Sequence, residues 1–200
     1  MLEQILDCHP AVAALDEPSA FVDVIEPEFH ESNNLSISRI NTLRRLYIHA
    51  LLQEAGAAAR GKLLVDKNPS PTARLPLWLR VFPELRVVIA LRDPRDVVFS
   101  CYFQNILLNA TNVNFLSFER LAKHYADLMD IWLAVREWDG FDWLETRYEK
   151  SRTKQFYSPT YQDVTRPVYT CAVGRWRAYE KHLAPILPAL EPYCRKFGYG

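Results

Sequence analysis

The apolar residues of the chain follow two patterns. In the first, they recur every three or four residues, which is the spacing that gives a helix one apolar face. This pattern predicts helices over residues 1–6, 36–60, 72–82, 94–108, 116–138, 169–183 and 185–197. In the second, apolar and β-branched residues form a short continuous run, which is typical of a strand buried on both faces. Such runs predict strands over residues 62–67 and 85–91, and residues 141–148 follow as a third strand.

The order of these elements predicts the fold class. Strands that alternate with long helices are typical of an α/β fold, in which helices flank a parallel sheet. Residues 10–30 lie outside the pattern and are expected to form an acidic, proline-containing connection, within one domain over residues 1–200. Ligands of such folds collect beyond the carboxyl ends of the strands. Charged residues stand there, namely Asp66 and Lys67, Arg92 and Asp93, and Arg147 and Glu149.

The composition narrows the classes of function. Lys plus Arg and Asp plus Glu each number 24, so the net charge is zero and no nucleic-acid partner is expected. No apolar stretch approaches the roughly 20 residues of a membrane span, and no basic leader precedes an apolar run. We therefore expect a soluble, cytoplasmic protein. The cysteines, Cys8, Cys101, Cys171 and Cys194, include no CxxC pair, so neither a zinc site nor a dithiol redox site is expected.

Two residues form a candidate anion site. Arg92 leaves the end of the second predicted strand, and Ser100 lies eight residues later on the next predicted helix. A guanidinium at a strand tip and a hydroxyl two turns along the following helix can hold one phosphate, because both donate hydrogen bonds. The alternative is that the charged residues at the helix start, Asp93, Arg95 and Asp96, are solvated and form only local ion pairs.

Five segments extend this pattern. LRDPRDVVFSCYF (91–103) resembles the segment of sulfotransferases that binds the 3′-phosphate of their cofactor. MLEQILDCHPAV (1–12) looks like the helix after the family's phosphate loop, and VDKNPSP (65–71) looks like its lysine-bearing strand end. DWLETRYE (142–149) is similar to the strand that ends in a Tyr-Glu pair, and RPVYTCAVGRWRAYEKHL (166–183) resembles a C-terminal signature. In this order, they resemble the sulfotransferase branch of protein-tyrosine sulfotransferases and their bacterial relatives.

The resemblance implies a P-loop NTPase-like sulfotransferase fold and a sulfuryl-transfer activity. The donor would be 3′-phosphoadenosine 5′-phosphosulfate (PAPS), and the product would be adenosine 3′,5′-bisphosphate (PAP). The acceptor would be a hydroxyl-bearing peptide, sugar or small molecule, with peptide tyrosine as one candidate. No metal would be needed, because positioning and electrostatic stabilisation dominate an in-line transfer of this kind. A nucleotide kinase or NTPase is disfavoured, since the sequence contains no GxxxxGK[ST] motif.

The resemblance also implies roles for individual residues. Lys67 would stabilise negative charge on the leaving phosphate, and Glu17 would accept the proton of the acceptor hydroxyl. The cofactor-binding residues would be Arg92, Ser100, Tyr148, Thr160 and Arg175. The alternatives are a surface position for Lys67, a solvated acidic loop for Glu17 and a core position for Tyr148.

The sequence departs from the family's pattern in three places. The phosphate loop and the strand before it would precede Met1, so we expect a chain that is truncated at its N-terminus, lacks both elements and is impaired in activity. Relatives continue after the Tyr-Glu pair through a further helix, which predicts an internal deletion after Glu149. Ser19 and Gln104 stand where the tyrosine-sulfating branch has arginines. The alternative function is a catalytically inactive nucleotide-binding or protein-interaction remnant, which is expected to self-associate through an exposed sheet edge.

Overall fold

The computed structural model describes residues 2–31, 34–68, 71–105, 109, 111–151 and 173–200. These residues form two compact units, one over residues 2–83 and the other from residue 84 onward. Each unit contains a two-stranded parallel sheet together with helices. Parallel strands flanked by helices confirm the predicted α/β class, whereas the single domain over residues 1–200 stays a prediction.

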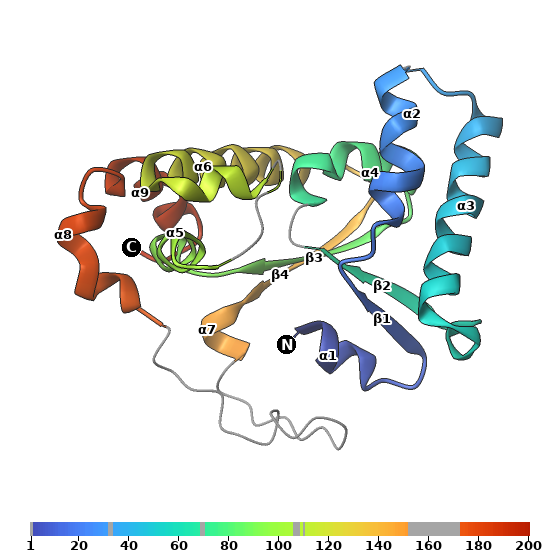
Figure 1. The fold of residues 1–200 in the computed structure, drawn as a ribbon, viewed down its shortest axis with the longest axis horizontal. Coiled ribbons are helices and arrows are strands. Elements are labelled where there is room, and N and C mark those ends of the chain that lie inside the picture. The colour runs from blue at the N-terminus through green and yellow to red at the C-terminus, as the bar shows by residue number, and fades with distance from the viewer. Residues whose placement is uncertain (1, 32–33, 69–70, 106–108, 110, 152–172) are drawn as a thin grey trace. The chain divides into compact units, whose positions relative to one another are not determined.

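The sheet of the first unit joins β1 (Val12–Asp16) to β2 (Leu63–Lys67). The two strands run parallel, and Asp16 stands opposite Lys67 at their carboxyl ends. α1 (Leu2–Asp7) precedes β1 and lies against it, as Figure 1 shows. Because the last residues of β1 and β2 are register partners, their charged side chains share one edge of the sheet.

Besides α1, further helices belong to the first unit, and the longest of them begins and ends at residues that favour helix termini. They are α2 (Glu26–Glu31), which follows a π-helical turn over Phe21–Ile25, α3 (Ile37–Ala55) and α4 (Leu75–Val81), with 3-10 turns over Ala57–Ala59 and Pro71–Arg74. α3 begins after Ser36, whose hydroxyl accepts a hydrogen bond from the Arg39 N–H at 3.2 Å. It ends at Gly56, whose φ of 80° only glycine adopts without steric cost. The helix is therefore shorter than the one predicted over residues 36–60.

An aromatic cluster forms the core of the first unit. Phe21 stacks on Trp78 with ring centroids 4.1 Å apart, and Tyr47 meets Trp78 edge-on at 5.2 Å. All three side chains are buried. Aromatic pairs of this kind contribute about 0.5–1.5 kcal/mol beyond the burial of their area. The cluster holds α3 and α4 together and anchors the π-helical turn that follows β1.

Tyr47 also reaches the end of β2, where its hydroxyl donates a hydrogen bond to Oδ2 of Asp66 at 2.8 Å. Burial raises the pKa of Asp66, and this hydrogen bond opposes the rise.

A carboxyl group whose pKa is raised by folding destabilises the protein as pH increases. The loss develops between the pKa of the unfolded state, about 3.9 for Asp, and the higher pKa of the folded state. We expect Tyr47→Phe to lower the free energy of unfolding by about 1.5–3 kcal/mol at pH 7, because a half-buried carboxylate loses its donor. The loss should be smaller at pH 4, where more Asp66 is protonated, as urea denaturation at both pH values would measure.

Tyr102→Phe is the matched control for this hydroxyl deletion. Tyr102 is 38% exposed, so its hydroxyl can bind water in the folded and unfolded states alike. We expect its stability to change by less than about 0.5 kcal/mol at either pH. A Tyr47→Phe loss of equal size at pH 4 and pH 7 would show that the charge of Asp66 is not involved.

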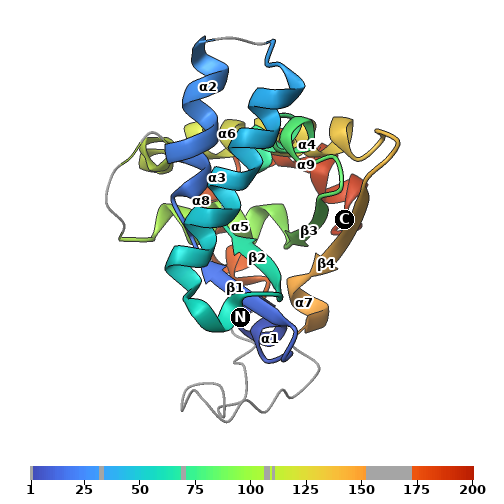
Figure 2. The ribbon, with the colours of Figure 1, turned by 90° about the vertical axis from the view of Figure 1, so that its right-hand side faces the viewer.

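The sheet of the second unit joins β3 (Arg86–Leu91) to β4 (Asp142–Arg147). These strands also run parallel, with Leu91 opposite Arg147 at their carboxyl ends, and Figure 2 shows them side by side. α7 (Tyr148–Ser151) follows β4 directly. The residues that follow Leu91 and Arg147 therefore emerge at one edge of this sheet.

Three helices form the core of the second unit. The helical segments of this unit, besides α7, are α5 (Pro94–Tyr102), α6 (Phe118–Val135), α8 (Glu180–Leu183) and α9 (Leu187–Lys196), with 3-10 helices over Asn112–Leu116 and Arg175–Tyr179. α5, α6 and α9 pack on one another and bury Val98, Trp132 and Leu190 completely. No helix in the described part of the chain is both long and apolar enough to cross a membrane.

Residues 10–30 contain the main error of the sequence prediction. Instead of an irregular connection, the structure has β1, the π-helical turn and α2 there. The five residues of β1, VAALD, form a short run that is rich in alanine and carries little intrinsic strand preference. They form a strand because β2 pairs with them. The predicted helix over residues 94–108 is too long, because α5 ends at Tyr102 and residues 103–105 are not helical. The last residues of this prediction and part of the predicted helix over residues 169–183 lie outside the described residues.

Candidate active site

The first cluster of charged residues lies at the carboxyl ends of β1 and β2. Lys67 ends β2 and stands opposite Asp16, which ends β1. The Lys67 Nζ contacts the Asp16 carboxylate and lies 2.9 Å from Oε1 of Glu17. The structure therefore brings together the two residues predicted to act in catalysis, Glu17 and Lys67, and adds Asp16 to them. Their catalytic roles stay predictions.

The backbone of Glu17 has an uncommon conformation. Its φ is 58°, and it is the only non-glycine residue with a positive φ in the described part of the chain. The Glu17 N–H donates a hydrogen bond to the Lys67 carbonyl at 2.7 Å, which ties the turn after β1 to the end of β2. The left-handed region costs an L-residue about 1–2 kcal/mol, and such strain is common at functional sites. Two contacts to Lys67, one from the backbone and one from the side chain, thus hold Glu17 in this turn.

The Lys67 ammonium is cationic at neutral pH. Burial acts to lower the pKa of Lys67, but the hydrogen bonds and negative charges of Asp16 and Glu17 outweigh burial and raise that pKa above its ordinary value. The side chains of Lys67 and Glu17 are 38% and 57% exposed, so a ligand can reach both. An exposed ammonium can bind an anion while a neighbouring carboxylate accepts a proton.

The second cluster lies at the carboxyl ends of β3 and β4. Arg92 follows β3 and Tyr148 follows β4, and the residues before them are register partners. The guanidinium carbon of Arg92 lies 4.8 Å from the centroid of the Tyr148 ring, which is a cation–π distance. Both residues are partly exposed. The Tyr148 ring thus orients the guanidinium that the sequence places at the strand tip.

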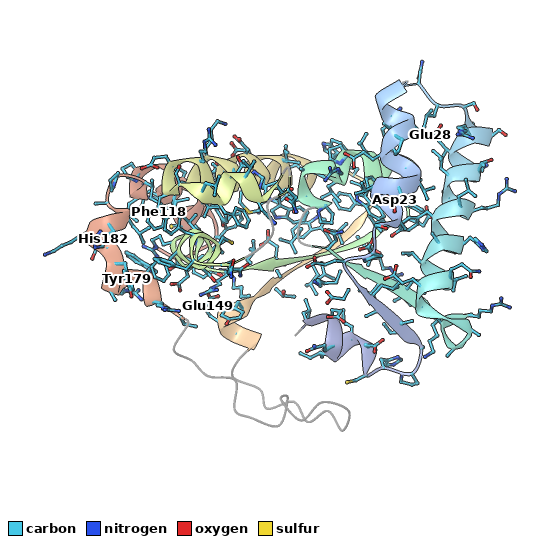
Figure 3. All side chains as sticks on the ribbon, in the orientation of Figure 1. Asp23, Glu28, Phe118, Glu149, Tyr179 and His182 are labelled. Carbon is cyan, nitrogen blue, oxygen red and sulfur yellow. The ribbon has the colours of Figure 1, made fainter. Side chains whose placement is uncertain are left out.

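Hydrogen bonds tie together the loops that follow β3 and β4. Oδ1 of Asp93 accepts a hydrogen bond from the Arg95 N–H at 2.9 Å and so caps α5. The Asp93 N–H donates to Oε1 of Glu149 at 3.1 Å, and the Tyr199 hydroxyl donates to Oε2 of Glu149 at 2.9 Å. Glu149, labelled in Figure 3, therefore fixes the loop that begins with Arg92.

One face of α5 carries the hydroxyl predicted to bind phosphate. Asp96 and Ser100 are four residues apart, so they lie on the same helix face. Nη2 of Arg92 lies 4.0 Å from Oδ2 of Asp96. Burial raises the pKa of the Cys101 thiol, and the positive charge of Arg92 opposes that rise. The contact to Asp96 places the Arg92 guanidinium near the face of α5 that carries Ser100, whose side chain is half-buried.

Arg175 joins the same helix from the C-terminal part of the chain. Its guanidinium carbon lies 5.5 Å from the ring centroid of Phe99, the residue before Ser100. The Asp96 carboxylate accepts hydrogen bonds from the backbone N–H groups on both sides of Arg175. Arg92 and Arg175 thus both lie beside α5, the helix that carries Ser100. All three residues were predicted to bind the cofactor.

Other predicted positions have different outcomes. Thr160 lies outside the described residues. The alternative of a solvated helix start with local ion pairs is right about the ion pair, since Arg95 contacts Asp93 at 2.8 Å, and wrong about solvation, because Asp93 is 7% and Asp96 0% exposed. Sequence reasoning missed the structural role of Asp96, although its three-residue spacing from the apolar Phe99 places both on one helix face. Among the described residues, no three His, Cys, Asp or Glu side chains gather as a metal site.

Comparison with known proteins gives one relative and one family match for the chain. A curated protein of Aquifex aeolicus (strain VF5), described as an uncharacterized protein, is 25% identical to the chain over 162 residues. This alignment covers 66% of the chain and 21% of the relative, so the chain spans about a fifth of the length of the curated relative it matches. The profile of the sulfotransferase family matches residues 1–156. Because that match covers more than half of the residues of the chain, the chain belongs to the sulfotransferase family.

Proposed function

We propose that the chain belongs to an enzyme that transfers a sulfuryl group from PAPS to an acceptor hydroxyl. The observation that carries this proposal is that Arg92 and Arg175 both contact α5, the helix that carries Ser100 and follows the carboxyl end of β3. Ligands of parallel α/β folds bind at this edge. In a sulfotransferase, two cations and a hydroxyl there favour a phosphorylated nucleotide. The acceptor would be a hydroxyl-bearing molecule, with peptide tyrosine as one candidate beside sugars and small alcohols.

We propose that α5 holds the nucleotide half of the donor. Arg92 offers a planar fork of donors that suits the 3′-phosphate, and the Ser100 hydroxyl offers one more. Arg175 adds a second positive charge, and Tyr148 and Thr160 are further candidates for contacts to the nucleotide. The residues present on this helix face therefore fit a phosphate.

We propose that Lys67 and Glu17 act on the group that is transferred. The donor supplies the sulfuryl group, whose bond to a phosphate oxygen breaks while a new bond to the acceptor oxygen forms. Glu17 would accept the proton of the acceptor hydroxyl, and Lys67 would stabilise the negative charge left on the phosphate oxygen. The 2.9 Å contact between Lys67 and Glu17 supports this assignment, because it sets a cation and a proton acceptor side by side.

Binding of PAP tests the assignment of the nucleotide half. We expect Arg92→Ala to weaken the affinity for PAP at least about tenfold, because hydrogen bonds to a charged group are lost. Isothermal titration calorimetry on the wild-type chain and the variant measures this change. We expect Ser100→Ala to have a smaller effect in the same direction, since its hydroxyl carries no charge.

Arg86→Ala is the matched control for this charge deletion. Arg86 begins β3, and its side chain is 76% exposed at the end of the strand opposite Arg92. The control removes the same charge from the same unit, so we expect an affinity equal to that of the wild type. Equal affinities of the Arg92→Ala variant and the wild type would reject the proposed phosphate site.

A further inference from the structure

We propose that Asp96 is a positioning residue that fixes Arg175 against α5. This inference rests on the proposed function, because it takes Arg175 as a residue that binds the nucleotide. Asp96 lies in the first turn of α5, and its side chain is completely buried. A buried carboxylate is costly unless hydrogen bonds and charges compensate it, so its partners indicate what it holds in place.

The partners of Asp96 flank Arg175 on both sides. Oδ2 of Asp96 accepts a hydrogen bond from the Gly174 N–H at 2.6 Å, and Oδ1 accepts one from the Trp176 N–H at 3.0 Å. Each carboxylate oxygen thus holds one neighbour of Arg175. Hydrogen bonds to an ionised acceptor are stronger than neutral ones. Together they fix the backbone orientation from which the Arg175 side chain extends toward Phe99.

The backbone at Gly174 allows both N–H groups to face one carboxylate. Gly174 has φ 69° and ψ 15°, and a left-handed residue in such a turn directs successive N–H groups toward a common anion. A side chain would be strained there, and its Cβ would lie 2.2 Å from Nη1 of Arg177. Asp96 and Gly174 therefore act together, although they are far apart in the sequence.

Asp96 also faces the other arginine of the proposed phosphate site. Nη2 of Arg92 lies 4.0 Å from Oδ2 of Asp96, on the helix face that carries Ser100. One buried side chain thus contacts both the Arg92 guanidinium and the backbone around Arg175. Because the oxygens of Asp96 are already bound to backbone N–H groups, its role is to position Arg175 rather than to touch the nucleotide.

Thermodynamic coupling between Asp96 and Arg175 tests this inference. We expect Asp96→Asn to weaken the affinity for PAP about tenfold, because an amide cannot accept both N–H groups. We expect Arg175→Ala to weaken the affinity to a similar extent. The double variant should bind PAP no more weakly than Arg175→Ala alone, since no side chain remains to be positioned. Titration calorimetry measures the four proteins, after circular dichroism has shown that each is folded.

Asp130→Asn is the matched control for the carboxylate deletion. Oδ1 of Asp130 on α6 accepts a hydrogen bond from the Tyr193 hydroxyl at 2.8 Å, outside the proposed phosphate site. We expect this variant to lose some stability and keep the wild-type affinity for PAP. If Asp96→Asn does not fold, Asp96→Glu replaces it in the same cycle, because it keeps the charge and moves both oxygens by one methylene.

Two outcomes would overturn the positioning role of Asp96. The first is an additive loss in the double variant, which would mean that Asp96 acts independently of Arg175. The second is an unchanged affinity in a folded Asp96→Asn protein. If Arg92→Ala weakens binding and Arg175→Ala does not, the positioning role fails while the proposed function stands. If neither arginine variant weakens binding, the proposed function itself fails.

Discussion

Replacing Lys67 with methionine is expected to lower the turnover of sulfuryl transfer about 100- to 1,000-fold. Methionine keeps an unbranched side chain but removes the ammonium that would stabilise the charge on the phosphate oxygen. Because the neighbouring carboxylates raise the pKa of Lys67, the ammonium is fully charged at neutral pH and the substitution removes one whole charge. Turnover is measured as the transfer of radioactive sulfur from labelled PAPS to peptide-tyrosine, sugar and small-alcohol acceptors.

Lys62→Met is the matched control for this prediction. Lys62 stands directly before β2, at the end of the strand opposite Lys67. Because both substitutions replace a lysine with methionine, they change the net charge equally. We expect the control to turn over at the wild-type rate. Unchanged turnover in Lys67→Met would contradict the role proposed for the ammonium. A wild-type chain that binds PAP and transfers sulfur to none of the acceptors would instead favour an inactive nucleotide-binding protein.

The positions of Lys67 and Arg92 could be predicted from the sequence for a simple physical reason. A strand buried on both faces is a continuous apolar run, so the first charged residues after the run mark where the strand leaves the core. β2 ends at Lys67 and β3 ends at Leu91, as predicted. The start of α5 at Asp93 could also be predicted from the local sequence, because a short acidic side chain before a proline is typical of a helix start.

The parts that could not be predicted depend on contacts between distant segments. β1 is too rich in alanine to be recognised as a strand, and it forms because β2 pairs with it. Asp96 has the local sequence of a surface acid at a helix start. It is buried because Gly174 and Trp176, in the C-terminal part of the chain, bind it through their backbones. Neither contact changes the local pattern of apolar and polar residues.

Glu17 was predicted as a site residue, but its backbone conformation depends on a contact with a distant segment. The resemblance to sulfotransferases pointed to Glu17, whereas the apolar pattern placed it in an irregular connection. Its φ of 58° is a conformation that glutamate seldom adopts, so no rule based on residue preference predicts it. The hydrogen bond from its N–H to the Lys67 carbonyl maintains the turn, and that bond requires β1 and β2 to be paired already.

Replacing Trp132 with alanine is expected to lower the free energy of unfolding of the second unit by about 3–5 kcal/mol. Trp132 of α6 is completely buried and meets Trp143 of β4 edge-on, with ring centroids 5.4 Å apart. Its Nε1 donates a hydrogen bond to Oε1 of Glu145 at 2.9 Å. The substitution leaves a cavity between α6 and β4 and removes a donor from Glu145. Urea denaturation followed by far-ultraviolet circular dichroism measures the loss.

Trp138→Ala separates the effect of burial from the loss of a tryptophan. Trp138 follows α6 closely but is 48% exposed, so we expect its stability to change by less than about 0.5 kcal/mol. Because Tyr148 follows β4 directly, the packing of Trp132 against β4 also supports the ring that orients Arg92. Trp132→Ala should therefore weaken the binding of PAP at urea concentrations that leave the wild-type chain folded. Equal stability of the Trp132→Ala and Trp138→Ala variants would contradict the stabilising role of the packing between Trp132 and β4.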